Sequence, residues 1–285
     1  MDINSQWIYV FFDVKPYHPV TDGMSPFYII TVKFTVITVC FNAADSIART
    51  IRSVIGQTYK DLEYIIVDGG STDGTLDIIN SYPDRISKIL CEPDHGIYDA
   101  MNKGIRLSHG DYVCFMNAGD CFFSSMTLEK VAAQIHGEDI VSGISHLVRH
   151  QYWIPIRPAA PTIRIAHGHN VNHQATLIRR EVLGEGYDTR FPIIADDLFF
   201  VDQVLFRKAS YKRLWQVVSV YDINGISSNP KYLVQIHSER ETFLLEHLPQ
   251  LPDFSSFSFK FSLLLEKIIH KLLTPYIRFC IEKQS

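Results

Sequence analysis

The sequence has few cysteines and no excess of basic charge. Five of its 285 residues are cysteines, and no two of them form a C-x-x-C pair, so the ligand spacing of a structural zinc site is missing. The net charge of −4 does not favour nucleic acid as a partner. We therefore expect free thiols in a reducing compartment and no bound nucleic acid.

Long apolar runs are also missing. No stretch reaches the roughly 18–20 apolar residues that a membrane-spanning helix needs. The first residues do not show the basic stretch and apolar core of a secretory signal. We expect a cytoplasmic protein that can still make peripheral contact with the inner membrane.

Two common nucleotide-binding motifs are absent as well. The turn Asp68–Gly74 is rich in glycine, but it is neither G-x-G-x-x-G nor a P-loop. A hydride-transfer enzyme is therefore disfavoured. The turn still offers backbone N–H groups, a hydroxyl and a carboxylate beside the start of a helix, and these groups can hold a nucleoside. The alternative is an ordinary capped turn between a strand and a helix.

What the chain does contain is an alternation of apolar strands and amphipathic helices. With 46% apolar residues, it can form one large domain, alone or with a smaller appendage. Alternating elements predict a parallel sheet with right-handed crossovers. In the first half we expect strands at 34–41, 62–68, 86–91 and 112–116, and helices at 47–57, 75–81 and 97–107. In the second half we expect strands at 140–143, 146–156, 172–178 and from 219, then a helical tail from about 231.

The stretch Gly110–Asp120 organises this pattern. Its apolar strand runs into a polar turn that carries Asn117, Gly119 and Asp120. Asp68 and Asp94 also follow strands, so three carboxylates are expected at the carboxyl edge of one sheet. Acids gathered in this way repel one another unless a cation or a donor-rich ligand relieves them. Taken alone, the turn is equally typical of a plain strand end.

Taken together, these segments resemble glycosyltransferase family 2, the large inverting group with the GT-A nucleotide-sugar-binding fold. The resemblance covers residues 33–135 and continues more weakly through 173–175, 194–197 and 225–228. Bacterial members that build surface polysaccharides, of the colanic-acid type, are especially similar. The segments that carry it are Thr35–Asn42, Ser53–Tyr59, Val67–Thr75, Glu92–Gly104 and Gly110–Asp120.

The resemblance implies a role for each matching position around the donor. Asp68 would lie against the nucleoside, and family members often carry a second acid where this chain has Gly69. The residues implied to bind the nucleotide sugar are Asp68, Ser71, Asp73, Asp94, Asn102, Lys103 and Asn117.

The same comparison implies a divalent metal, Mg²⁺ or Mn²⁺. Asn117–Asp120 stands where the family carries its D-x-D metal motif, and Asn117 and Gly119 replace two expected acids. Asp120 is left as the best carboxylate for the cation. Strict metal dependence therefore stays open.

The catalytic and acceptor residues implied by the resemblance lie in the second half. Asp196 falls at the position of the catalytic base, and Asp197 is the rival candidate. On residue type alone, both acids are also typical of the first turn of a helix. His173 and Gln174 would face the acceptor sugar, and a structural role for them is the alternative.

The predicted organisation has three parts. Residues 1–32 form an N-terminal extension, of which 1–23 are either native or precede a start at Met24. Residues 33–230 form the GT-A catalytic domain, with a nucleotide-sugar half (33–135) and an acceptor half (136–230). Residues 231–285 form a helical segment in which the basic, amphipathic stretch Phe257–Phe279 lies on a membrane or packs against protein.

We expect an inverting glycosyltransferase that moves a sugar from a nucleoside diphosphate to a hydroxyl of a lipid-linked glycan, in bacterial surface polysaccharide synthesis. One alternative is a nucleotidyltransferase, but 40–44 lacks the basic phosphate loop that it needs. The other is a nucleotide-sugar-binding protein with weakened catalysis, which the altered metal motif suggests.

Overall fold

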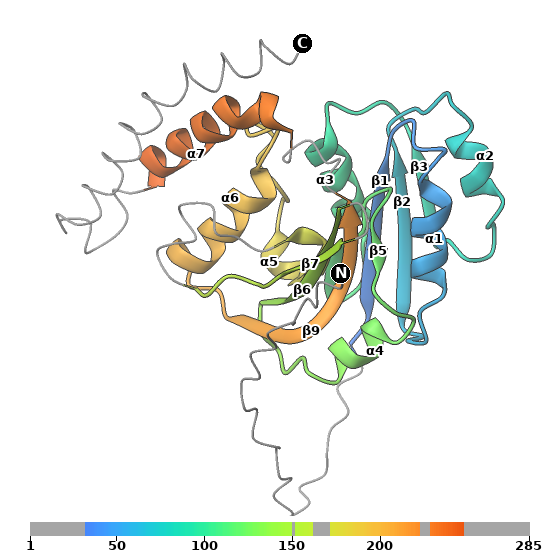
Figure 1. The fold of residues 1–285 in the computed structure, drawn as a ribbon, viewed down its shortest axis with the longest axis horizontal. Coiled ribbons are helices and arrows are strands. Elements are labelled where there is room, and N and C mark those ends of the chain that lie inside the picture. The colour runs from blue at the N-terminus through green and yellow to red at the C-terminus, as the bar shows by residue number, and fades with distance from the viewer. Residues whose placement is uncertain (1–31, 150–151, 162–171, 223–228, 248–285) are drawn as a thin grey trace, which may run out of the picture. The chain divides into compact units, whose positions relative to one another are not determined.

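The computed structural model describes residues 32–149, 152–161, 172–222 and 229–247 (Figure 1). Residues 1–31 of the predicted extension, the loop 225–228 and the stretch Phe257–Phe279 lie outside the described residues. Within the described part of the chain, no helix combines the length and the apolar character needed to cross a membrane.

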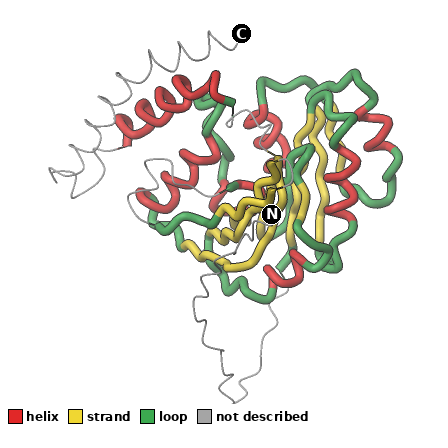
Figure 2. The backbone as a smooth tube through the Cα atoms, viewed as in Figure 1, coloured by secondary structure: helices red, strands yellow, loops and turns green. Residues whose placement is uncertain are grey.

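A mixed, mostly parallel sheet forms the centre of the fold (Figure 2). Along the sheet the strands follow the order β3-β2-β1-β4-β8-β6-β9-β5, and β7 pairs with β6. β8 runs antiparallel to both of its neighbours, whereas β6 and β9 are parallel to each other. The strands are β1 (Phe34–Cys40), β2 (Leu62–Asp68), β3 (Lys88–Cys91), β4 (Tyr112–Phe115), β5 (Cys121–Phe122), β6 (Ile140–Arg149), β7 (Tyr152–Ile156), β8 (Thr176–Arg179) and β9 (Tyr211–Asp222).

Helices cover both faces of the sheet (Figure 1). The helices are α1 (Ile47–Ile55), α2 (Thr75–Asn80), α3 (Ile97–Leu107), α4 (Thr127–Ala132), α5 (Arg180–Leu183), α6 (Ala195–Val201) and α7 (Leu233–His247). Short helical turns lie at η2 (His173–Ala175), η3 (Asp202–Phe206) and η5 (Pro230–Tyr232).

Two hydrophobic cores follow from the two-residue period of the strands. In β1, Ile37 and Val39 face a core shared with α3, α6 and α7, whereas Phe34 and Val36 face a core shared with α1, α2 and α4. Close packing of α3 on β1 requires a glycine, because a Cβ atom at Gly104 would lie 2.5 Å from the Ile37 side chain. α3 thereby packs directly against the middle of β1.

The strand register brings the ends of β1, β2 and β3 together. Cys40 is aligned with Asp68, and Asp68 with Cys91. The polar turns after these strands therefore begin at one edge of the sheet, as the sequence predicts for parallel strands. The predicted α/β architecture and the first-half elements are confirmed, with ends that differ by one or two residues.

The second half departs from its prediction. β6 is one continuous strand, where the sequence pattern indicated two strands broken near Gly143. Its polar residues remain inside the sheet because their hydroxyls are paired: Ser142 with Thr176 at 2.9 Å, and Ser145 with Ser219 at 2.9 Å. The predicted strand 172–178 begins instead as the turn η2 and becomes extended only at Thr176. The start of the predicted C-terminal segment, α7, packs into the core that contains residues of α3 and α6.

Candidate functional site

The turn after β2 is organised by the carboxylate of Asp68. Its Oδ1 accepts hydrogen bonds from the N–H groups of Gly70 (3.0 Å) and Ser71 (2.8 Å), and its Oδ2 accepts one from the Ser71 hydroxyl (2.6 Å). The thiols of Cys40 and Cys91 each lie 3.4 Å from one carboxylate oxygen. Burial raises the pKa of Asp68, but these hydrogen bonds outweigh it and hold the pKa below its ordinary value.

This arrangement bears on the predicted role of Asp68. The residue is fully buried, and both oxygens already accept bonds from its own turn. Its carboxylate shapes the turn that would face the nucleoside, and direct contact with the nucleoside stays a prediction.

The turns after β1 and β2 are bonded to each other. Asp73 accepts from the N–H of Ala44 (3.0 Å) and from the hydroxyl and N–H of Thr75. The side-chain oxygen of Asn42 accepts from the N–H of Thr72, and the N–H of Asn42 donates to Ser71 Oγ. Ser71 and Asp73 therefore fix the shape of this edge, and their binding of a nucleotide sugar stays a prediction.

Asp94 approaches the same turn from the end of β3. A Cβ atom added at Gly69 would lie 2.4 Å from Asp94 Oδ2 and 3.4 Å from the ring of Phe41. Gly69 thus leaves room for the Asp94 carboxylate where family members often carry a second acid. The Phe41 ring is 62% exposed beside these residues, and an exposed aromatic ring can stack on a base. Phe41 carried no sequence signal beyond its place at a strand end.

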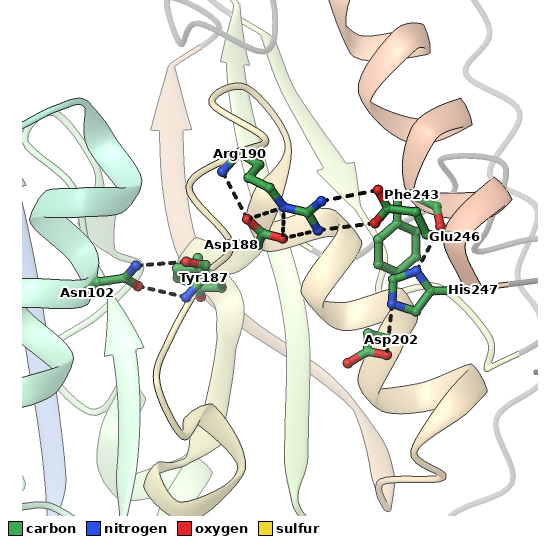
Figure 3. Close-up of polar contacts among 8 residues, drawn as sticks. All are labelled: Asn102, Tyr187, Asp188, Arg190, Asp202, Phe243, Glu246 and His247. Atoms are coloured by element: carbon green, nitrogen blue, oxygen red, sulfur yellow. Dashed lines mark hydrogen bonds and ion pairs between the residues drawn. The ribbon is translucent and has the colours of Figure 1, made fainter.

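The side chains of Asn102 and Lys103, on α3, bind other segments of the same chain. The Asn102 amide exchanges two hydrogen bonds with the backbone of Tyr187, at 2.8 and 2.7 Å (Figure 3). Lys103 binds the carbonyl of Pro93 at 2.7 Å and Glu92 at 3.0 Å. Asn102 therefore ties α3 to the acceptor half, and Lys103 holds the loop that carries Asp94. Their predicted contact with the nucleotide remains a prediction.

The organising turn, Asn117–Asp120, is held by α1. The N–H of Gly119 donates to the Thr50 hydroxyl at 2.9 Å, and Arg49 donates to the Gly119 carbonyl. Gly119 has a φ of 104°, a backbone conformation that an acid at this position would adopt only with strain. The turn therefore requires glycine where the family motif has its second acid. Arg49 also places a positive charge beside Asp120.

A line of hydrogen bonds joins this turn to Asp196, the first of two acids on α6. The Asn117 amide nitrogen lies 3.1 Å from His173 Nε2, and His173 Nδ1 lies 2.7 Å from Asp196 Oδ2. The Tyr98 hydroxyl, from α3, donates to Asp196 Oδ1. Tyr98 on α3 and His173 in η2 thus both bond to Asp196, the predicted base, and Asn117 is linked to it through His173.

The charges along this line reinforce one another. Burial lowers the pKa of His173, but the hydrogen bond and charge of Asp196 outweigh it and raise the pKa above its ordinary value. Burial raises the pKa of Asp196, but the bonds from His173 and Tyr98 outweigh it and lower the pKa. Asp196 is therefore ionised at neutral pH and able to accept a proton.

Asp197 lies in a different environment. Its Oδ2 accepts from the Arg240 guanidinium of α7 at 2.6 Å. Burial raises the pKa of Asp197 to about 7, while the charge of Arg240 opposes the rise. A pKa near neutrality suits a general base, but geometry takes precedence over pKa in assigning one. Among the described residues, the hydrogen bonds from the turn of Asn117 lead to Asp196 and not to Asp197, so the geometry favours Asp196.

The residues at the turn fit a divalent cation of the magnesium type. Asn117 Oδ1 is buried without a partner, and burial raises the pKa of Asp120 to about 6 against the opposing effects of His173, Gln174 and Arg49. A cation would satisfy the amide oxygen and the carboxylate together. The described part of the chain holds no cluster of three or more His, Cys, Asp or Glu side chains suited to a metal. Most ligands would therefore come from phosphates and water, as is usual for Mg²⁺.

The structure thus brings the predicted residues together in two groups. One group lies around the turn after β2 and comprises Asp68, Ser71, Asp73 and Asp94. The other lies around the turn after β4 and comprises Asn117, Asp120, His173, Gln174 and Asp196. Among the described residues, no hydrogen bond joins Asp120 to Asp68 or Asp94, and the convergence of the three carboxylates stays a prediction. Tyr98, Arg49 and Arg240 were missed, because their partners are distant in the sequence.

Comparison with known proteins supports the resemblance. The family model for glycosyl transferase family 2 matches residues 35–182. A PGL/p-HBAD biosynthesis glycosyltransferase of Mycobacterium bovis is 34% identical over 172 residues, which cover 57% of this chain and 66% of that protein. The chain thus spans just under two thirds of this relative. An Escherichia coli enzyme named UDP-Glc:alpha-D-GlcNAc-diphosphoundecaprenol beta-1,3-glucosyltransferase WfaP is 35% identical over 105 residues, covering 36% of this chain and 39% of that protein.

Solved structures share the fold. Staphylococcus aureus TarS, residues 1–349 in complex with UDP-GlcNAc, aligns with a TM-score of 0.61 at 19% identity, covering 75% of this chain and 66% of that one. The mannosyltransferase PcManGT from Pyrobaculum calidifontis, in complex with GDP-Man and Mn²⁺, aligns with a TM-score of 0.56 at 18% identity, covering 86% and 85%. The predicted GT-A architecture is confirmed.

Proposed function

The chain belongs to glycosyl transferase family 2, and on that premise we propose that it is an inverting enzyme that transfers a sugar from a nucleoside diphosphate to a glycan hydroxyl. That it is a glycosyltransferase follows from the family and from its named relatives. Its mechanism, donor and acceptor are the proposal.

The observation that carries the proposal is the line Asn117–His173–Asp196. It connects the turn at the position of the family's metal motif to an ionised carboxylate. Inversion requires one base to take the acceptor's proton while the hydroxyl attacks the anomeric carbon from the face opposite the leaving diphosphate. Asp196 would be that base for a sugar held at this turn.

The donor's nucleotide would bind at the first two turns. Phe41 offers an exposed ring for the base, and Asp94 offers a carboxylate oxygen beside Gly69. The N–H groups of the turn after β2 are fixed by Asp68, which keeps the pocket in one shape. A preformed pocket lowers the cost of ordering on binding.

The diphosphate would lie over the turn Asn117–Asp120. Asp120 and the unpartnered Asn117 Oδ1 would hold Mg²⁺ or Mn²⁺, which when bound supplies positive charge to the leaving diphosphate. Arg49, bonded to the Gly119 carbonyl, adds a second positive charge to the same turn. The leaving group is thereby stabilised as its charge grows.

We further propose a lipid-linked acceptor and action at the cytoplasmic face of the inner membrane, in surface glycan synthesis. The name of the similar Escherichia coli enzyme includes a diphosphoundecaprenol acceptor. His173, beside Asp196, and Gln174, beside Asp120, are the proposed contacts on the acceptor side.

The test is a transfer assay with radiolabelled UDP-glucose, UDP-GlcNAc and GDP-mannose, each with Mg²⁺ or Mn²⁺ and with undecaprenyl-diphosphate-linked GlcNAc. One donor should be consumed with wild-type protein. Asp196→Asn should abolish transfer and leave the affinity for UDP, measured by calorimetry, within about twofold. Asp197→Asn is the matched control and should retain transfer. Activity in D196N together with loss in D197N would exchange the two assignments.

A binding protein with weakened catalysis is the second candidate, because Asn117 and Gly119 replace two acids of the motif. Such a protein would bind UDP or GDP and release no sugar from any donor, even by slow hydrolysis. The same assay separates the two, since an enzyme of this family should hydrolyse its own donor slowly without acceptor. No structural observation favours a nucleotidyltransferase, and the family match opposes it.

A further inference from the structure

Helix α7 is attached to the segment that carries the proposed base. Phe243 packs against the rings of Phe191 and Phe206, and it is 5% exposed. At the end of the helix, Glu246 pairs with Arg190 at 3.1 Å (Figure 3). Both contacts reach the loop before α6 or the turn after it. The family match ends at residue 182, so α6 and α7 both lie beyond it.

One residue of α7 binds the backbone just before Asp196. Glu239 is 7% exposed, and its Oε2 accepts from the N–H groups of Ile193 and Ile194, both at 3.1 Å. Its Oε1 accepts from Gln235 at 3.0 Å. Hydrogen bonds to a buried carboxylate are charge-assisted and stronger than neutral ones. Glu239 therefore fixes the chain two residues before the proposed base.

The carbonyls of the same short segment are fixed from the other side. The Tyr98 hydroxyl lies 3.0 Å from the carbonyl of Ile193 and also donates to Asp196 Oδ1. The N–H of Ile193 is thus held by α7, and its carbonyl by α3. Because both the N–H and the carbonyl of Ile193 are bonded, the backbone that follows has little freedom to move. The position of the Asp196 carboxylate is restricted as a result.

The next residue along α7 holds the rival acid. Arg240 binds Asp197 at 2.6 Å, and its side chain is 14% exposed. Adjacent residues of one helix thus fix the backbone before Asp196 and engage the carboxylate after it. The Asp197 carboxylate is paired with Arg240, whereas the Asp196 carboxylate accepts hydrogen bonds from His173 and Tyr98.

We propose that α7 is a positioning helix for the catalytic base, with Glu239 as its principal positioning residue. The proposal rests on the proposed function of Asp196. Glu239 touches no substrate. It sets the place of the Asp196 carboxylate by holding the N–H groups of Ile193 and Ile194, and Arg240 keeps Asp197 from taking that place.

The test compares Glu239→Gln with Glu246→Gln in the full chain. Both replace a glutamate of α7 that binds the 187–194 loop, but only Glu239 binds the backbone before Asp196. E239Q should lower kcat by about tenfold to a hundredfold, the range expected for a displaced catalytic group. The KM for the donor and the calorimetric affinity for UDP should stay within about twofold. E246Q should leave kcat unchanged, even where it lowers the melting temperature by a similar amount.

A milder variant covers the case in which E239Q does not fold. Gln235→Ala removes the bond to Glu239 Oε1 and leaves both bonds to the backbone, so kcat should fall about threefold with an unchanged UDP affinity. Wild-type kcat in folded E239Q, or in Q235A where E239Q is insoluble, would overturn the proposal. So would equal losses of kcat in E239Q and E246Q. An inactive wild type, or an active D196N, would instead count against the proposed function.

Discussion

The two halves of the site are held together in different ways. In the donor half, Asp68 binds residues two and three positions away, and Asp73 binds a residue two positions away. In the acceptor half, Asp196 binds Tyr98 across 98 residues, and Glu239 binds Ile193 across 46. The turn after β2 is closed by its own residues and tied to the turn after β1, whereas the carboxylate of the proposed base is held by His173 and Tyr98 from distant elements.

This difference separates two kinds of acid. Asp68 is an acid whose oxygens are used by its own turn, and its pKa is lowered. Asp197 is an acid whose neighbours come from another helix, and burial raises its pKa. Several hydrogen-bond donors thus offset the cost of burying a carboxylate more completely than the single partner Arg240 does, and the same holds for Asp196. We expect mutations in the donor half to act first on stability, and those in the acceptor half to act first on kcat.

The largest effect is expected from Asp68→Ala. The change leaves two backbone N–H groups and a hydroxyl without their acceptor, and it should reduce the free energy of unfolding by about 3 kcal/mol or more. UDP binding should be lost with it. Asp94→Ala is the control, since Asp94 accepts one bond, from Gly96 at 2.9 Å. D94A should weaken UDP binding with little change in urea denaturation. Equal stability of D68A and D94A would contradict the contrast.

The next effect concerns His173, which binds both Asn117 and Asp196. His173→Ala should lower kcat about tenfold to a hundredfold with an unchanged donor KM, because the base loses its neighbour. The acceptor KM should rise as well, since His173 is also a proposed contact of the acceptor sugar, and a normal kcat would contradict its role beside the base. His109→Ala is the matched control: His109 also pairs with a carboxylate, Glu63 at 3.1 Å, away from these turns. It should leave steady-state rates unchanged.

A smaller effect should appear in the pH dependence of stability. The pKa of Asp197 is raised to about 7 in the folded protein. Its contribution to stability is therefore fully present below its ordinary pKa and is lost as pH rises through about 7. Asp197→Asn does not titrate, so this loss, on the order of 2 kcal/mol between pH 5 and 8, should disappear. Urea denaturation of both proteins at pH 5, 6, 7 and 8 measures it. Parallel stability curves would contradict the raised pKa.

The same contrast explains which features could be predicted from the sequence. The periods of β1, β2 and α3 and the turn residues after them are local signals, and these elements were placed within one or two residues. Tyr98 looked like any aromatic residue on the buried face of α3, and Glu239 like any acid in a helical tail. Their roles depend on contacts across 98 and 46 residues, which no local pattern encodes. β6 was predicted as two strands because Gly143 and Ser145 are untypical of a strand interior. Their partners on β9 are distant in the sequence, so no local pattern shows the pairing that keeps β6 continuous.

The smallest predicted effect tests the donor pocket at Gly69. This backbone lies outside the left-handed region, so alanine introduces no backbone strain there, but its Cβ would lie 2.4 Å from Asp94 Oδ2. The carboxylate has to move, and since it is the end of a side chain, stability should change by less than about 1 kcal/mol. We expect Gly69→Ala to weaken UDP binding about fivefold, through the displaced carboxylate. In a D94A background the same change should add almost nothing, because the group that it displaces is gone. Additive losses in the double variant, measured by calorimetry, would show that Gly69 acts on the nucleotide without Asp94.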